Sequence, residues 1–107
     1  MLEKEKILIV DDSEDIRVLL NRILKAAGYE VYAVSSGEDA LRQAMELKPD
    51  LILLDIVMPG ISGYEVCKRL KTEDSPVDAT VIFLSAKSDA ADKIKGLEIG
   101  GSDYITK

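Results

Sequence analysis

Residues 51–63 are Leu51-Ile52-Leu53-Leu54-Asp55-Ile56-Val57-Met58-Pro59-Gly60-Ile61-Ser62-Gly63, and they determine the architecture of the chain. The run of four aliphatic residues is typical of a strand buried on both faces, as in the centre of a parallel sheet. Asp55 follows at the carboxyl end of that strand, where open α/β sheets bind their ligands. Pro59, Gly60 and Gly63 predict a shaped loop before the next helix. Asp55 is therefore either a candidate site residue or only a helix cap, and the rest of the chain must decide.

A second aliphatic run, residues 7–10, ends in Asp11 and Asp12. Further strands are predicted at residues 30–34, 81–85 and 103–107. Four amphipathic helices alternate with the five strands. The first helix ends at Gly28, the second begins at a capping box of Ser36 with Asp39 and ends at Pro49, and the third runs from about Gly63 to Lys71. The residues predicted to point inward from the first helix are Ile16, Leu19, Leu20, Ile23 and Leu24, and those of the fourth are Ala91, Ile94 and Leu97.

This alternation predicts a single domain with a doubly wound α/β fold, built on a five-stranded parallel sheet with right-handed crossovers. The chain ends on its last strand, so no final helix returns across the sheet. Sheets of this kind are covered on both faces. We therefore expect apolar strand surface to be exposed on the face that carries one helix, unless further residues or another chain cover it. Self-association through this face is one expected consequence.

The composition excludes several classes of function. A net charge of −6 with no histidine argues against a nucleic-acid-binding surface, which needs clustered Lys and Arg. The single Cys67 excludes an intrachain disulfide, and no signal peptide or long apolar span is visible, so the sequence predicts a cytoplasmic protein. Cys67 has no histidine to activate it and is predicted to serve packing.

The carboxyl ends of parallel strands meet at one edge, so five side chains should converge there. They are Asp11, Asp12, Asp55, Ser85 and Lys107. Three carboxylates without imidazole or thiolate make a hard-oxygen site, which favours Mg²⁺ or Mn²⁺ over zinc. A dication together with Lys107 would balance the three carboxylate charges. Such a site could hold a metal ion and still admit an anion.

These motifs, in this order, resemble the receiver domain of bacterial two-component response regulators over the full chain. The resemblance rests on Asp11-Asp12, on Asp55 with Met58-Pro59 and Gly63, on Ser85-Ala86, and on Tyr104 with Lys107. It implies a flavodoxin-like fold with strand order 2-1-3-4-5. It also implies that residues 1–107 are a single receiver domain that stops before its last helix.

The resemblance implies a role for each acid. Asp55 would accept a phosphoryl group from the phosphohistidine of a sensor histidine kinase or from a phosphotransfer protein. Asp12 and Asp55 would bind Mg²⁺ directly, Asp11 would bind it through water, and Val57 would bind it through its backbone carbonyl. The domain would assist its own phosphorylation and dephosphorylation without being a turnover enzyme. Its change of shape would control an output domain or a partner.

Three further residues receive roles from the resemblance. Lys107 and Ser85 would each hold a phosphoryl oxygen, and Ser85 and Tyr104 would move as a switch when Asp55 is phosphorylated. Tyr104 could also be an ordinary half-buried edge aromatic. Two features usual in the family are not seen in this sequence. One is a proline directly after the position of Lys107, and the other is a fifth helix after that proline.

Three other functions remain open. A flavodoxin-like cofactor module would need a glycine- or hydroxyl-rich phosphate loop, where this chain has Asp11-Asp12-Ser13-Glu14-Asp15. A Mg²⁺-dependent phosphatase similar to the haloacid dehalogenases would need Asp-x-Asp after the first strand. The third alternative is a receiver-shaped interaction or dimerisation module that is not phosphorylated.

Overall fold

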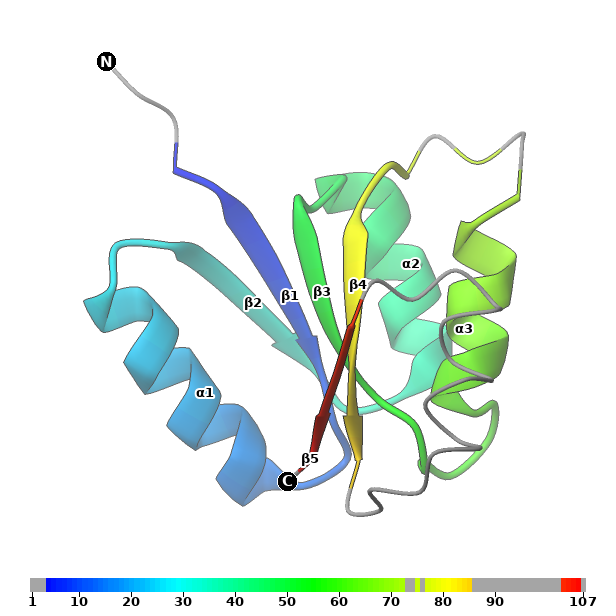
Figure 1. The fold of residues 1–107 in the computed structure, drawn as a ribbon, viewed down its shortest axis with the longest axis horizontal. Helices are drawn as coiled ribbons and strands as arrows, with labels where there is room; N and C mark the ends of the chain where they lie inside the picture. Colours follow the sequence, from blue (N-terminus) through cyan, green and yellow to red (C-terminus); the bar gives the residue numbers. More distant parts are fainter. Residues whose placement is uncertain (1–3, 73–74, 76, 86–102, 107) are drawn as a thin grey trace.

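The structure is a computed structural model that describes residues 4–72, 75, 77–85 and 103–106, without the side chains of Ser85 and of 103–106. Strands and helices alternate from residue 6 to residue 85 (Figure 1). The elements are β1 (Lys6–Val10), α1 (Glu14–Ala26), β2 (Glu30–Val34), α2 (Gly37–Leu47), β3 (Leu51–Asp55), α3 (Gly63–Leu70), β4 (Thr80–Ser85) and β5 (Asp103–Thr106). The predicted fourth helix lies outside the described residues.

The five strands form one sheet in the order β2-β1-β3-β4-β5, and every neighbouring pair is parallel. Helix α1 lies on one face of this sheet, and α2 and α3 lie on the other (Figure 1). The predicted doubly wound α/β fold and its strand order are thus confirmed. All strands point their carboxyl ends to the same edge, which is the edge predicted to carry the site.

Serine side chains begin the three described helices. The hydroxyls of Ser13, Ser36 and Ser62 accept hydrogen bonds from backbone N–H groups three residues ahead, at 3.4, 3.2 and 3.2 Å. Each bond satisfies one of the N–H groups that a helix start leaves without an intrahelical partner. Gly28 follows the end of α1 with φ +99°, the left-handed conformation expected of a glycine after a helix.

Alternate residues of the central strands belong to two apolar clusters on opposite faces. The larger cluster packs against α2 and α3, and it contains Leu8, Val10, Ile52, Leu54 and Phe83. The smaller one packs against α1, and it contains Ile7, Ile9, Leu53 and Leu84. All nine side chains are buried. Strands β1 and β3 are therefore covered on both faces, as their unbroken aliphatic runs predict.

Helix α1 differs from the sequence prediction. Leu20 and Leu24 pack against the smaller cluster, but Leu19 and Ile23 are 52% and 53% exposed. The predicted inward stripe of five residues is therefore wrong for Leu19 and Ile23, because the stripe is wider than the contact that α1 makes with the sheet. On the same face of the sheet Leu53 is buried and Ile82 is partly buried, while the side chains of β5 lie outside the described residues, so the expected exposure of apolar strand surface stays an expectation. Among the described residues, Leu19 and Ile23 of α1 are the apolar side chains of this stripe that are more than half exposed.

Cys67 on α3 is fully buried, which confirms the predicted packing role. Burial raises the pKa of its thiol, and the charge of Lys71 opposes this increase in part. We expect a disulfide reagent at mildly alkaline pH to label the folded protein at least about a hundredfold more slowly than the urea-unfolded chain, because reaction requires opening of the core. The rate of thiol release measures this difference. Equal rates in the two states would contradict it.

Candidate functional site

Asp11, Asp12 and Asp55 come together at the carboxyl edge of the sheet. Strands β1 and β3 are paired with Val10 opposite Leu54, so the residues that follow, Asp11 and Asp55, lie side by side. One carboxylate oxygen from each of the three acids lies within 4.8 Å of the others. Asp11 and Asp55 are buried and Asp12 is exposed. The sequence prediction of an acid cluster at this edge is thus confirmed for these three residues.

The loop from β1 to α1 is held by side chains around Asp11. The Asp11 carboxylate accepts a hydrogen bond from the Ser13 N–H at 2.9 Å, and Ser13 in turn caps α1. The Arg17 guanidinium donates to the backbone carbonyl of Asp11 at 2.7 Å. Arg17 therefore places a positive charge beside the backbone of Asp11, next to the acid cluster. The sequence analysis missed it, because a contact from a side chain to a carbonyl six residues earlier leaves no spacing pattern.

The loop from β3 to α3 is shaped by glycine, as predicted. Gly63 N–H donates to the Ile56 carbonyl at 2.8 Å, which closes residues 56–63 into a compact loop. A Cβ on Gly63 would lie 2.1 Å from the Asp55 carbonyl oxygen, so only glycine permits this approach. Gly60 has φ +82°. Val57 lies two residues after Asp55, between Ile56 and Gly60, and it is 71% exposed.

The backbone of β4 and β5 brings two more predicted residues toward this region. Leu84 pairs with Asp55, so Ser85 is the next residue at the same edge, and Ser85 pairs with Thr106 of β5. Tyr104 pairs with Phe83, further back along the strands. The side chains of Ser85 and Tyr104, and the whole of Lys107, lie outside the described residues. Their predicted roles stay predictions.

The arrangement can bind a divalent cation. Three carboxylates offer hard oxygen ligands, and close negative charges repel one another unless a cation lies among them. The chemistry of these ligands and their short separation therefore fit a divalent-metal site.

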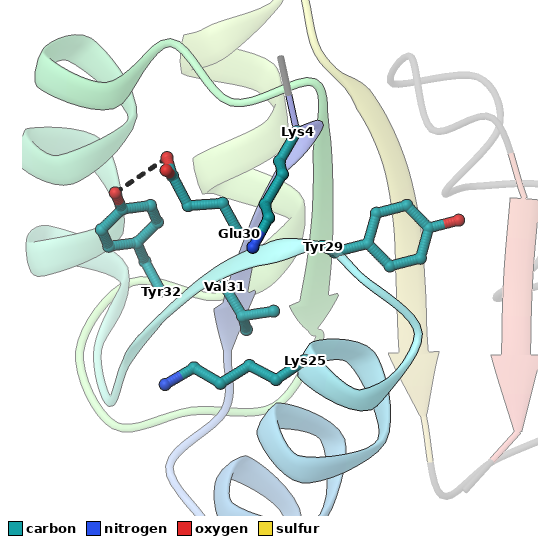
Figure 2. A pocket seen from close by; sticks show the side chains of 6 residues that line it. All are labelled: Lys4, Lys25, Tyr29, Glu30, Val31 and Tyr32. Carbon is teal, nitrogen blue, oxygen red and sulfur yellow. Dashed lines mark hydrogen bonds between the residues drawn. The ribbon is translucent and has the colours of Figure 1, made fainter. Parts of the chain in front are cut away.

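A cavity of about 380 Å³ lies elsewhere, around the start of β2 (Figure 2). It is lined by Lys4, Lys25, Tyr29, Glu30, Val31 and Tyr32. Tyr32 donates a hydrogen bond from its hydroxyl to the Glu30 carboxylate at 2.9 Å, and this bond raises the pKa of Tyr32. Glu30 is the first residue of β2, so the cavity lies at the amino end of a strand. Its single carboxylate and its place distinguish it from the acid cluster.

Among the residues that the structure describes, no helix is both long and apolar enough to cross a membrane.

Comparisons with known proteins identify a family in keeping with the acid cluster. Residues 7–107 match the response regulator receiver domain family. The alkaline phosphatase synthesis transcriptional regulatory protein PhoP of Bacillus subtilis is 46% identical over 103 residues, which are 96% of this chain and 42% of that protein. The chain spans less than half the length of the curated relatives it matches.

Solved structures have the same fold. The BeF3-activated N-terminal receiver domain of Klebsiella pneumoniae RstA has a TM-score of 0.88 and 31% identity, and the alignment covers 96% of this chain and 86% of that one. The chemotaxis response regulator CheY4 of Vibrio cholerae has a TM-score of 0.91 and 30% identity, with 98% and 88% of the two chains covered.

Proposed function

Because the chain belongs to the response regulator receiver domain family of two-component signalling, we propose that it is a phosphorylation switch in which Asp55 accepts the phosphoryl group. Receiver domains are phosphoacceptor signalling modules rather than turnover enzymes. One observation carries the proposal: the buried Asp55 lies within 4.8 Å, between carboxylate oxygens, of Asp11 and Asp12. An Asp that served only as a helix cap would not need two further carboxylates beside it.

The metal is proposed to be Mg²⁺, with Mn²⁺ as a substitute. Asp12 and Asp55 would bind it directly, Asp11 through water, and the exposed Val57 segment through its backbone carbonyl. Mg²⁺ favours a few carboxylates and retained waters over a full protein cage, which suits this cluster at a sheet edge. When bound, the ion supplies positive charge for the three carboxylates and for the phosphoryl oxygens.

In the proposed transfer, an Asp55 carboxylate oxygen attacks phosphorus. The new bond joins oxygen to phosphorus, the bond from phosphorus to the imidazole nitrogen of the donor breaks, and the donor histidine leaves. Lys107 and Ser85 would hold phosphoryl oxygens as they gain charge. Ser85 would move toward the phosphoryl group and Tyr104 would turn inward, so that phosphorylation shifts the domain between two conformations.

The proposed partner in this transfer is a sensor histidine kinase or a phosphotransfer protein, whose phosphohistidine would be the donor in the cell. The names of relatives such as PhoP and PhoB describe transcriptional regulators. We therefore propose that the signal passes to an output function, and control of transcription is the first candidate. We also propose that the protein acts in the cytoplasm.

Intact mass spectrometry tests the proposed function. Incubation with Mg²⁺ and acetyl phosphate should add one phosphoryl group of about 80 Da, and a chelator should prevent the gain because the transfer requires the metal. A folded protein that binds Mg²⁺ but gains no mass would instead favour the interaction module that is not phosphorylated.

Asp12→Ala should weaken Mg²⁺ binding by at least about tenfold, because it removes a proposed direct ligand. The melting temperature without metal should stay equal or rise, since one of three repelling charges is gone. Calorimetric titration and thermal unfolding measure the two effects. Asp15→Ala, which removes an exposed acid from the first turn of α1, is the matched control. Equal Mg²⁺ affinity in the two variants would contradict the assignment of Asp12.

A further inference from the structure

The first turn of α2 contacts the loop that follows Asp55. One Glu38 carboxylate oxygen accepts a hydrogen bond from the Ile61 N–H at 3.3 Å. The same oxygen would lie 2.7 Å from a Cβ placed on Gly60, whose φ is +82°. The carboxylate therefore lies against the Gly60–Ile61 turn and binds its backbone. A carboxylate that accepts a backbone N–H makes a charge-assisted hydrogen bond, which is stronger than a neutral one.

A second contact secures the same turn from its apolar side. A Cβ on Gly37 would lie 2.5 Å from the Ile61 side chain and 2.8 Å from the Val66 side chain. Gly37 is buried, and Ile61 packs against the larger apolar cluster. The backbone of α2 therefore approaches Ile61 as closely as packing permits. Gly37 and Glu38 are adjacent in sequence and contact the same turn. Glu38 binds its backbone N–H at Ile61, and Gly37 packs against the Ile61 side chain.

This turn lies between the two ends of the proposed metal-binding loop. The loop starts at Asp55, carries the exposed Val57, and returns to the sheet where Gly63 N–H donates to the Ile56 carbonyl. Gly63 fixes the base of the loop, so its outer part depends on other contacts for its position. The contact with Glu38 is made at residues 60–61, within that outer part.

We infer that Glu38 is a positioning residue for the phosphoacceptor loop: its carboxylate holds the Gly60–Ile61 turn and thereby places the Val57 carbonyl for the metal. The effect on metal binding rests on the proposed function, whereas the effect on the loop does not. Helix α2 thus links the outer edge of the site to the core of the domain.

The neighbouring acid provides a matched control. Asp39 is also in the first turn of α2, but its carboxylate pairs with Arg42 at 3.3 Å. Both acids interact favourably with the helix dipole. Asp39→Ala therefore removes the same charge from the same turn and leaves the Glu38 contact in place. Glu38→Gln removes the charge but keeps an oxygen that can accept the Ile61 N–H.

The experiment compares Glu38→Ala, Glu38→Gln and Asp39→Ala by amide NMR during a Mg²⁺ titration. Glu38→Ala should raise the Kd for Mg²⁺ about threefold relative to Asp39→Ala, the size expected for one exposed charge-assisted hydrogen bond. Glu38→Gln should restore part of the affinity, because its amide oxygen can still accept the Ile61 N–H, in a weaker, neutral hydrogen bond. Equal values for Glu38→Ala and Asp39→Ala would overturn the inference.

Spectra without metal separate this inference from the proposed function. The Ile61 amide resonance should shift in Glu38→Ala and stay in place in Asp39→Ala, because only Glu38 binds that N–H. An Ile61 amide that is unchanged in Glu38→Ala would overturn the inference whatever the metal does. A wild-type protein that binds no Mg²⁺ would overturn the proposed function, and the Ile61 amide would then decide the inference by itself.

Discussion

Asp55→Asn is expected to abolish phosphorylation of this chain and to leave it folded. The amide has nearly the shape of the carboxylate but lacks the anionic oxygen that must attack phosphorus. Asp55 is 4% exposed, so the substitution keeps the packing of a buried position while it removes one of three clustered charges. Lower repulsion in the cluster should offset the weaker interactions of a neutral amide, and we expect a melting temperature within a few degrees of the wild type.

Intact mass after incubation with Mg²⁺ and acetyl phosphate measures this result. The wild type should gain about 80 Da per phosphoryl group and Asp55→Asn should gain nothing. Asp15→Asn makes the same chemical change at an exposed acid outside the cluster and should keep the full gain. An acid-labile mass gain in Asp55→Asn would mean that another residue is the acceptor, and it would remove the basis of the proposed mechanism.

The sequence predicted the sheet and the acid cluster because both follow from patterns that are local. Unbroken aliphatic runs at residues 7–10 and 51–54 require burial on both faces, and this burial requires parallel neighbours and helical crossovers. Once the strands are parallel, the residues that follow them share one edge. The meeting of Asp11 and Asp55, which are 44 positions apart, thus needed no knowledge of their contacts.

Arg17 and Glu38 could not be predicted in the same way. Each binds the backbone of a loop, Arg17 at the Asp11 carbonyl and Glu38 at the Ile61 N–H. A backbone group is present at every residue, so the sequence does not mark the partner. The exposure of Leu19 and Ile23 has a related cause. Helical spacing gives the side of α1 on which a residue lies, but the width of the contact with the sheet is set by tertiary packing.

Gly63→Ala is expected to destabilise the fold by about 3 kcal/mol or more, the upper range for overpacking a position that cannot relax. The added Cβ would lie 2.1 Å from the Asp55 carbonyl oxygen and 2.9 Å from the Ile56 Cα. Both atoms belong to the backbone, so no side-chain rotation relieves the clash. The carboxyl end of β3 or the start of α3 must move, and either movement changes the loop that follows Asp55.

Gly28→Ala is the control for Gly63→Ala, because it measures the cost of backbone strain at a glycine where an added Cβ meets no other atom. Gly28 has φ +99° and no atom within 4 Å of an added Cβ, so its substitution should cost only about 1–2 kcal/mol of left-handed strain. Urea unfolding of both variants measures the two costs. The larger loss at Gly63 would show that the space beside Asp55 is filled by backbone. A Gly63→Ala protein as stable as Gly28→Ala would mean that β3 and α3 can separate without cost, and that the loop between them is not held as closely as this structure places it.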